Sequence, residues 1–298
     1  MKKLGFSLSP GMLLGRPESI LGAAVHARFG NTRELLKELK ARGVSSIEIR
    51  NLPQSAREDL GARLVETVWQ AGLEVSVHGG ADTEGEGGSR EFSEVYPPVK
   101  ELIKYSAAHQ KDIIMVIHAY TGDQDKVEEL KERSVSLLRS WASLAESGEV
   151  PLRFALELTR RRVGKGDPAA GVEDLLGMVR EVNSPYVGIT WDMGHYYANV
   201  LKAGSSLQNP VGLVLPARGF LEHTVHTHIH GIGAKGTHGP LGPRESLPLE
   251  EYVEALREVE YQGIYNLELD FRRFPDDEDP VEHIFGALAR LDQSLAGC

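Results

Sequence analysis

Eight short apolar runs recur along the chain, and stretches with helical spacing separate them. The runs cover residues 4–9, 45–51, 73–79, 112–120, 153–159, 186–192, 224–231 and 265–270. Each run has the length of a strand, and several are rich in Val and Ile. In the stretch 31–43, for example, Leu35, Leu36 and Leu39 lie on one stripe, with Asn31 or Thr32 as N-cap and Gly43 as a stop. Eight such alternations predict a parallel sheet closed into a single (β/α)8 TIM barrel.

The length agrees with one domain of this kind. A barrel of alternating strands and helices takes about 250 residues as one unit, and this chain has 298. We therefore expect residues 1–298 to form one domain. An open doubly wound sheet usually carries a Gly-rich phosphate loop after its first strand, and SLSPGMLLG is not that motif. The irregular segments 79–95 and 202–222 lie near strand ends, where we expect active-site loops.

Composition narrows the class of partner and the compartment. The formal net charge is -10 and the pI is near 5.6, which argues against broad binding to nucleic acid or to an anionic membrane. The one cysteine, Cys298, permits no disulfide within the chain. No apolar stretch approaches the ~18–20 residues that span a bilayer, and the N-terminus lacks a signal-peptide core. We expect a cytoplasmic protein with no membrane partner.

Acidic and imidazole side chains stand at the ends of most of these apolar runs. They are His78, His118, Glu157, Asp192, His195, His228 and Glu268, and His238 lies in the loop GTHGP. The carboxyl ends of barrel strands converge on one face, so these groups are expected to meet there. Imidazole and carboxylate without thiol suit zinc, manganese, iron or cobalt better than calcium or an iron–sulfur cluster. Because unpaired buried carboxylates are costly, the joint pattern predicts a metal site.

Other polar residues near these positions have two open interpretations each. Strand alternation places His226, His228 and His230 on one face. His230 either orients a ligand or fills the interior, whereas His226 lies deeper and is expected to be structural. Glu48 and Arg50 share a face of the second strand and are expected to pair. The basic loop RRVGKGD, residues 161–167, either attracts an anionic group or is solvated.

Two further residues are candidate substrate contacts. Lys235 either supplies a cation for a substrate oxygen or phosphate or is an exposed loop lysine. Trp191, with Tyr196, either forms an apolar wall against a sugar ring or packs in the core.

Taken together, these residues resemble the xylose-isomerase-like TIM barrels, which include sugar isomerases, 3-epimerases and apurinic-site endonucleases. The resemblance spans the whole chain. It implies that one divalent ion is held by Glu157, Asp192, His228 and Glu268, which match the epimerase ligands in ALELT, WDMGH, HIHG and LELD. It also implies that Glu157 and Glu268 are the catalytic acid–base pair and that His195 contacts substrate oxygens.

The endonuclease branch of the same group holds further zinc ions, and His78, His118 and His238 match its extra histidines. The match is incomplete at two places. That branch has an Asp-x-His segment where this chain has Gly236 before His238, and the motif of the seventh strand commonly carries Asp where this chain has Gly231. The resemblance therefore implies one to two ions, zinc or manganese, and possible pairing into a homodimer.

The leading hypothesis is an isomerase or epimerase of a small sugar or polyol derivative that depends on a divalent metal. In it, metal polarisation of a carbonyl lets a carboxylate remove a carbon-bound proton. The alternatives are a zinc-dependent apurinic-site endonuclease or phosphodiesterase, a sugar-derivative dehydratase on the same site, and a barrel that only binds a ligand. The net charge and the Glu-rich loop 81–91 argue against DNA, so a carbohydrate is the expected partner.

Overall fold

The computed structural model describes residues 3–17, 20–52, 59–79, 97–147, 152–203, 214–242, 247–275 and 279–297. Eight parallel strands form a closed barrel in which the last strand pairs with the first. They are β1 (Lys3–Leu8), β2 (Val44–Leu52), β3 (Glu74–Gly79), β4 (Ile113–Ile117), β6 (Leu152–Glu157), β8 (Val187–Asp192), β9 (Thr224–Ile229) and β12 (Ile264–Leu267). Each strand falls on one of the apolar runs, so the predicted (β/α)8 barrel is confirmed.

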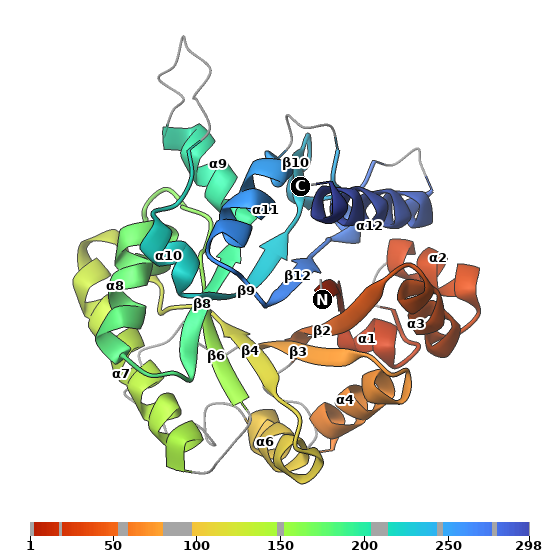
Figure 1. The fold of residues 1–298 in the computed structure, drawn as a ribbon, viewed down its shortest axis with the longest axis horizontal. Coiled ribbons are helices and arrows are strands. Elements are labelled where there is room, and N and C mark those ends of the chain that lie inside the picture. Colours follow the sequence, from red (N-terminus) through yellow and green to blue (C-terminus); the bar gives the residue numbers. More distant parts are fainter. Residues whose placement is uncertain are drawn as a thin grey trace.

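Helices surround the strands on the outside of the barrel (Figure 1). They are α1 (Pro10–Leu13), α2 (Ile20–Phe29), α3 (Thr32–Ala41), α4 (Leu60–Gln70), α6 (Pro97–His109), α7 (Val127–Ser147), α8 (Val172–Val182), α9 (Met193–Ala203), α10 (Arg218–Glu222), α11 (Leu249–Glu258) and α12 (Pro280–Ala296). Asn31 is the N-cap of α3, because its Oδ1 accepts a hydrogen bond from the Glu34 amide at 3.0 Å. The start of this helix is therefore where the sequence predicts it. None of the described helices is both long enough and apolar enough to cross a bilayer.

Strand β8 shows how side-chain alternation divides the molecule into two regions. Trp191 is fully buried and packs against Phe220 of α10 and Tyr252 of α11, with ring centroids 6.4 and 5.0 Å away. Its neighbours Thr190 and Asp192 lie on the opposite face of the strand and are also fully buried. The apolar core thus fills the layer between strands and helices, while the barrel interior is polar.

Two small antiparallel sheets organise the loops that follow the barrel strands. Strands β10 (Gly231–Gly233) and β11 (Gly236–Gly239) form a hairpin after β9. Strands β5 (Gly122–Asp123) and β7 (Lys165–Gly166) join the loop after β4 to the loop after β6. A side chain at Gly231 would overlap the Pro240 carbonyl, which explains why this position has no aspartate. Of the two predicted active-site loops, residues 80–96 and 204–213 lie outside the described residues.

Candidate metal centre

The predicted ligand residues meet at the carboxyl end of the barrel. Glu157, Asp192, His228 and Glu268 each offer one ligand atom, and these atoms all lie within 4.8 Å of one another. All four side chains are at most a few per cent exposed. They come from β6, β8, β9 and the end of β12, so the inward face of consecutive strands positions them.

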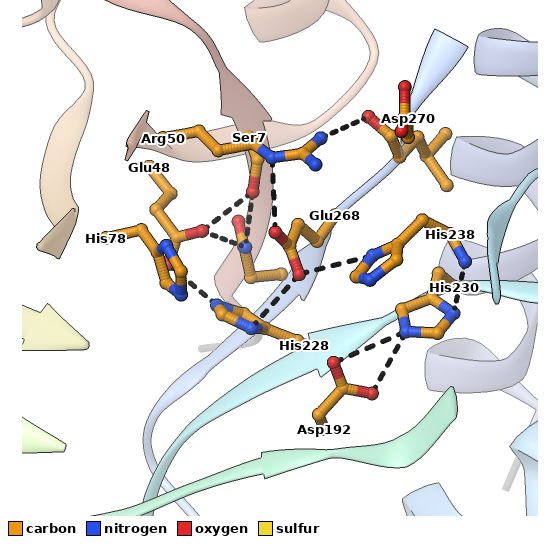
Figure 2. Close-up of polar contacts among 12 residues, drawn as sticks. Ser7, Glu48, Arg50, His78, Asp192, His228, His230, His238, Glu268 and Asp270 are labelled. Carbon is orange, nitrogen blue, oxygen red and sulfur yellow. Dashed lines mark hydrogen bonds and ion pairs between the residues drawn. The ribbon is translucent and has the colours of Figure 1, made fainter. Parts of the chain in front are cut away.

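His228 uses its two ring nitrogens in different directions. Its Nε2 lies 2.9 Å from Glu48 Oε2 on the floor of the site. Its Nδ1 faces the mouth, 3.2 Å from Glu268 Oε2 and 3.4 Å from Glu157 Oε1, and Figure 2 shows the contact with Glu268. If Nε2 carries the proton that binds Glu48, then Nδ1 presents a lone pair to these oxygens.

The unpartnered atoms of this group test whether a cation fits. His228 Nδ1 and Glu268 Oε2 are both buried, and neither makes a hydrogen bond within the described part of the chain. Two buried electron-pair donors that face each other at 3.2 Å are poorly accommodated without a positive charge between or beside them. An imidazole with three carboxylates is a donor set suited to zinc or manganese. The residues therefore fit a divalent ion.

A second group shares Glu157 with the first. Its Oε2 lies 2.8 Å from His78 Nε2 and 2.9 Å from His118 Nε2, and the three residues form another cluster able to hold an ion. Glu157 Oε1 faces His228 instead. One carboxylate thus stands between the two groups, with an oxygen toward each, which is the arrangement by which a carboxylate bridges two ions.

The third group, His195, His230 and His238, is less open to an ion. Its three imidazoles are close enough together, but His230 already uses both nitrogens. Nδ1 accepts a hydrogen bond from the His238 amide at 2.9 Å, and Nε2 lies 3.0 Å from Asp192 Oδ1 (Figure 2). His230 therefore orients Asp192, the first of its two predicted roles. Gly194 permits this, since a side chain there would overlap the His230 ring.

His195 lies on the cavity wall beside Asp192. Its amide donates to Asp192 Oδ1 at 2.7 Å, and its Nδ1 is 3.0 Å from Asp192 Oδ2. His238 Nδ1 is 3.5 Å from Glu268 Oε2. Both imidazoles thus border the four-residue group and are available for a metal or a substrate oxygen.

Burial and neighbouring charges set the protonation of the site. Burial alone would raise the pKa of Glu157, but His118 and His228 more than offset it and hold this pKa well below the usual value. For Glu268, His228 and Arg50 outweigh burial and lower the pKa to about 2. Burial dominates at His195 and lowers its pKa to about 4. At neutral pH the two glutamates are therefore bases and His195 is a neutral ligand or acceptor.

Asp192 and His228 shift in the other direction. Burial raises the pKa of Asp192 to about 6. Burial would lower the pKa of His228, yet the carboxylates of Glu48, Glu268 and Glu157 hold it well above its usual value. The negative charge around His228 thus favours a cation at this point, whether a proton or a metal ion.

Glu48 corrects one sequence-based prediction. It does not pair with Arg50. Glu48 is fully buried, its Oε2 lies 2.9 Å from both His226 and His228, and its Oε1 accepts hydrogen bonds from Ser7 at 2.8 Å and Asn266 at 3.2 Å. The inward parity of β2 points to this position, but only the structure shows which histidines it meets.

Arg50 instead pairs with Glu268. Its Nε is 3.3 Å from Glu268 Oε1, and its Nη1 donates to the Leu269 carbonyl at 3.0 Å. The structure favours the second interpretation of two candidate substrate contacts. Trp191 is in the outer core, as described above. Lys235 lies in the β10–β11 turn, where its Nζ donates to the Phe274 carbonyl at 2.8 Å and braces that loop.

Above the ligands lies a cavity of about 670 Å³. Its lining includes His78, His118, Glu157, His195, His238 and Glu268. This volume is within the ~300–1,000 Å³ typical of small-molecule sites. The arrangement combines a buried set of residues that could hold a metal ion with two ionised carboxylates on the wall of a space for a small molecule.

The chain belongs to the family described as xylose isomerase-like TIM barrels, whose model matches residues 29–291. Among curated proteins, it is 38% identical over 84 residues to the uncharacterized protein MJ1188 of Methanocaldococcus jannaschii; that match spans 26% of this chain and 31% of the relative. The predicted family is therefore confirmed.

Several solved epimerases share the fold. D-Psicose 3-epimerase of Clostridium cellulolyticum H10, solved with D-tagatose, matches with a TM-score of 0.65 and 17% identity, over 99% of each chain. D-Allulose 3-epimerase of Methylomonas sp. matches with a TM-score of 0.64 and 15% identity, over 99% of each chain. The 3-keto-D-glucoside 4-epimerase of E. coli matches with a TM-score of 0.63 and 16% identity, over 98% of this chain and 100% of that one. At sequence identities this low, the structural matches show a common fold and nothing more.

Proposed function

We propose that this protein is an enzyme that epimerises or isomerises a small sugar derivative with the help of a divalent metal ion. The observation that carries the proposal is the placement of Glu157 and Glu268 next to the same atom, His228 Nδ1, at 3.4 and 3.2 Å. Both glutamates line the same cavity. The epimerases of matching fold agree with this proposal.

The side chains divide the chemical work. Asp192 and His228 would hold the ion, because both are fully buried and their contacts with His230 and Glu48 fix their orientation. When bound, the ion supplies electrophilic polarisation of a substrate carbonyl and its neighbouring hydroxyl, which acidifies the C–H bond between them. Glu157 and Glu268, ionised at neutral pH, take and return that proton at their carboxylate oxygens.

A second candidate is metal-assisted phosphodiester hydrolysis at an abasic site. The specific observation in its favour is the group formed by His78, His118 and Glu157, which adds a place for a second ion next to the first. Paired ions suit the displacement of a phosphate ester. The net charge of -10 opposes it.

The first test is metal content followed by proton exchange. We expect purified protein, after incubation with zinc or manganese and desalting, to retain one to two ions per chain by mass spectrometry of the metals. In D₂O, the loaded protein should then catalyse deuterium incorporation at carbon next to the carbonyl in a panel of ketopentoses, ketohexoses and their monophosphates, followed by NMR. Retention of no stoichiometric metal would refute both candidates.

Glu268→Gln tests the proton-transfer role. We expect exchange to fall by about 10³-fold, within the range for loss of an acid–base group, while the circular dichroism spectrum stays that of the wild type. Normal exchange by this variant would remove Glu268 from the mechanism. Nicking of an abasic-site duplex by the loaded wild type, without exchange on any sugar, would favour the second candidate.

A further inference from the structure

Cationic side chains gather on the wall of the cavity that holds the metal ligands. They are Arg50, Arg160, Arg161, Arg162, Lys202 and Arg273. Three of them are consecutive and follow Glu157 by only three to five residues. The loop that leaves β6 thus lines the same cavity as Glu157 and Glu268.

The backbone of this arginine loop, residues 158–164, is held in place. The Arg161 amide donates to Asn199 Oδ1 at 2.8 Å, and Asn199 Nδ2 donates to the Thr159 carbonyl at 2.9 Å. Farther along, β7 pairs with β5. Because helix α9 and a neighbouring strand both hold the loop, its backbone keeps the three arginines at the cavity and needs little ordering when a ligand binds.

Several other surface arginines have an acidic partner. Arg42, Arg139 and Arg218 each pair with a glutamate, at 2.9, 3.1 and 2.8 Å. Within the described residues, the side chains of Arg160, Arg161 and Arg162 make no hydrogen bond or ion pair.

An acid stands close to the arginine loop without pairing with it. Asp167 instead accepts hydrogen bonds from the Thr159 hydroxyl at 2.6 Å and the Ala169 amide at 3.0 Å. In a chain with ten more acidic than basic side chains, three adjacent unpaired guanidinium groups on a cavity wall have a charge that a ligand can satisfy.

We infer that this cavity binds a sugar monophosphate, with the phosphoryl group at Arg160, Arg161 and Arg162 and the reacting carbons at Glu157 and Glu268; this inference rests on the proposed function. A phosphate monoester carries nearly two negative charges and offers three acceptor oxygens, which matches several planar guanidinium donors. The cavity of about 670 Å³ accommodates such a ligand.

A nucleic-acid backbone would offer the same phosphoryl chemistry, but the charge distribution favours the small molecule. Strand recognition needs cations spread over a long surface. Here the unpaired arginines are on one loop at one cavity, and the chain as a whole is acidic.

The experiment compares each ketose of a panel with its terminal monophosphate, D-fructose and D-fructose 6-phosphate among them, by isothermal titration calorimetry on metal-loaded protein. We expect at least one monophosphate to bind about 100-fold more tightly than its free sugar, since hydrogen bonds between charged partners are stronger than neutral ones. In R160Q/R161Q/R162Q that preference should fall about 30-fold or more, with the free-sugar affinity unchanged. No preference in the wild type would overturn the inference.

A matched control removes the same charge elsewhere. R42Q/R139Q/R218Q also changes the net charge by three, but its arginines pair with glutamates outside the cavity. The phosphate preference should survive in this variant. An equal loss in both triple variants would mean a general charge effect and no phosphoryl site.

The exchange assay separates failure of this inference from failure of the proposed function. Exchange on free sugars that equals exchange on monophosphates, unchanged in R160Q/R161Q/R162Q, would overturn the phosphoryl site and leave the epimerase proposal standing. Arginine-dependent binding of a monophosphate without exchange on any sugar would support the site and reject the proposed function. Arginine-dependent binding and nicking of an abasic duplex, with no monophosphate preference, would assign the arginines to a nucleic acid and overturn the inference.

Discussion

Two polar clusters share the His228 ring yet differ in what they leave unsatisfied. The lower cluster, Glu48, His226 and His228, and the upper cluster, Glu157, Asp192, His228 and Glu268, both meet the geometric requirement for holding an ion. In the lower cluster, each oxygen of Glu48 has its own protein partners. In the upper cluster, Glu268 Oε2 accepts no hydrogen bond from any described residue, and Glu268 lines the cavity.

The difference shows that ligand type and spacing alone do not define a metal site. A buried carboxylate whose oxygens are saturated by protein donors is a structural anchor, whereas one with an unpartnered oxygen beside a cavity can accept an ion. On this view Glu48 serves the upper cluster indirectly, because it accepts a hydrogen bond from His228 Nε2 and turns Nδ1 toward Glu157 and Glu268.

The largest effect should come from the residue that joins the ligand groups. Glu157→Gln removes a charge that faces His228 on one oxygen and His78 and His118 on the other. We expect metal content to drop below one ion per chain and proton exchange to fall by about 10³-fold or more. Metal analysis and the NMR exchange assay measure both. Retention of two ions would contradict the bridging position.

A smaller effect is expected from the floor of the site. Glu48→Gln keeps the shape but weakens the orientation of His228, so metal affinity should fall by about 10–100-fold, as for other residues that orient ligands. Competition with a fluorescent chelator measures this affinity. Ser7→Ala, which removes only one donor to Glu48, is the matched control and should change affinity much less. If the lower cluster bound an ion itself, Glu48→Gln would remove one full equivalent.

The pH dependence of the stability of the metal-free protein tests the charge of Glu268 in the upper cluster. The pKa of Glu268 is about 2 in the folded protein, below its usual 4.5. The unfolded state therefore binds more protons between these values, and the free energy of unfolding should decrease as pH falls from 4.5 toward 2, by on the order of 3 kcal/mol in total. Urea titrations in chelator check this. Glu268→Gln should flatten the slope, and an unchanged slope would contradict the assignment.

The smallest effect should be at Lys235. Its ammonium group braces the β10–β11 turn against the Phe274 carbonyl. Lys235→Met should therefore change KM less than about two-fold on any sugar that the wild type uses, with a modest loss of thermal stability. A large rise in KM would restore Lys235 as a substrate contact.

Much of this molecule was predictable because the signals are periodic. Alternating strands and helices fix the barrel, and polar residues at strand ends locate the ligand residues, since parallel strands share one carboxyl end. Partner choice among interior side chains was not predictable. Glu48 could have paired with Arg50 on its own strand or with histidines from another strand. Only the packing across the barrel shows that His226 and His228 are its partners.

Long-range contacts decided the remaining cases. Trp191 precedes a ligand in sequence, but strand parity turns it outward toward Phe220 and Tyr252. The role of His230 depends on the amide of His238, which only the β10–β11 hairpin brings within reach. Such contacts join residues whose spacing carries no periodic signal.

His228 contacts Glu48 on the barrel floor with one ring nitrogen and Glu268 beside the cavity with the other. A change in the hydrogen bonds of Glu48 can therefore alter the electron density at the nitrogen that faces the cavity. Ser7 and Asn266 are buried and do not line the cavity. Their hydrogen bonds to Glu48 nevertheless influence the strength of the hydrogen bond between Glu48 and His228. Natural variation at these concealed positions would tune metal preference and rate while leaving substrate choice at the entrance untouched, so the two properties can evolve separately.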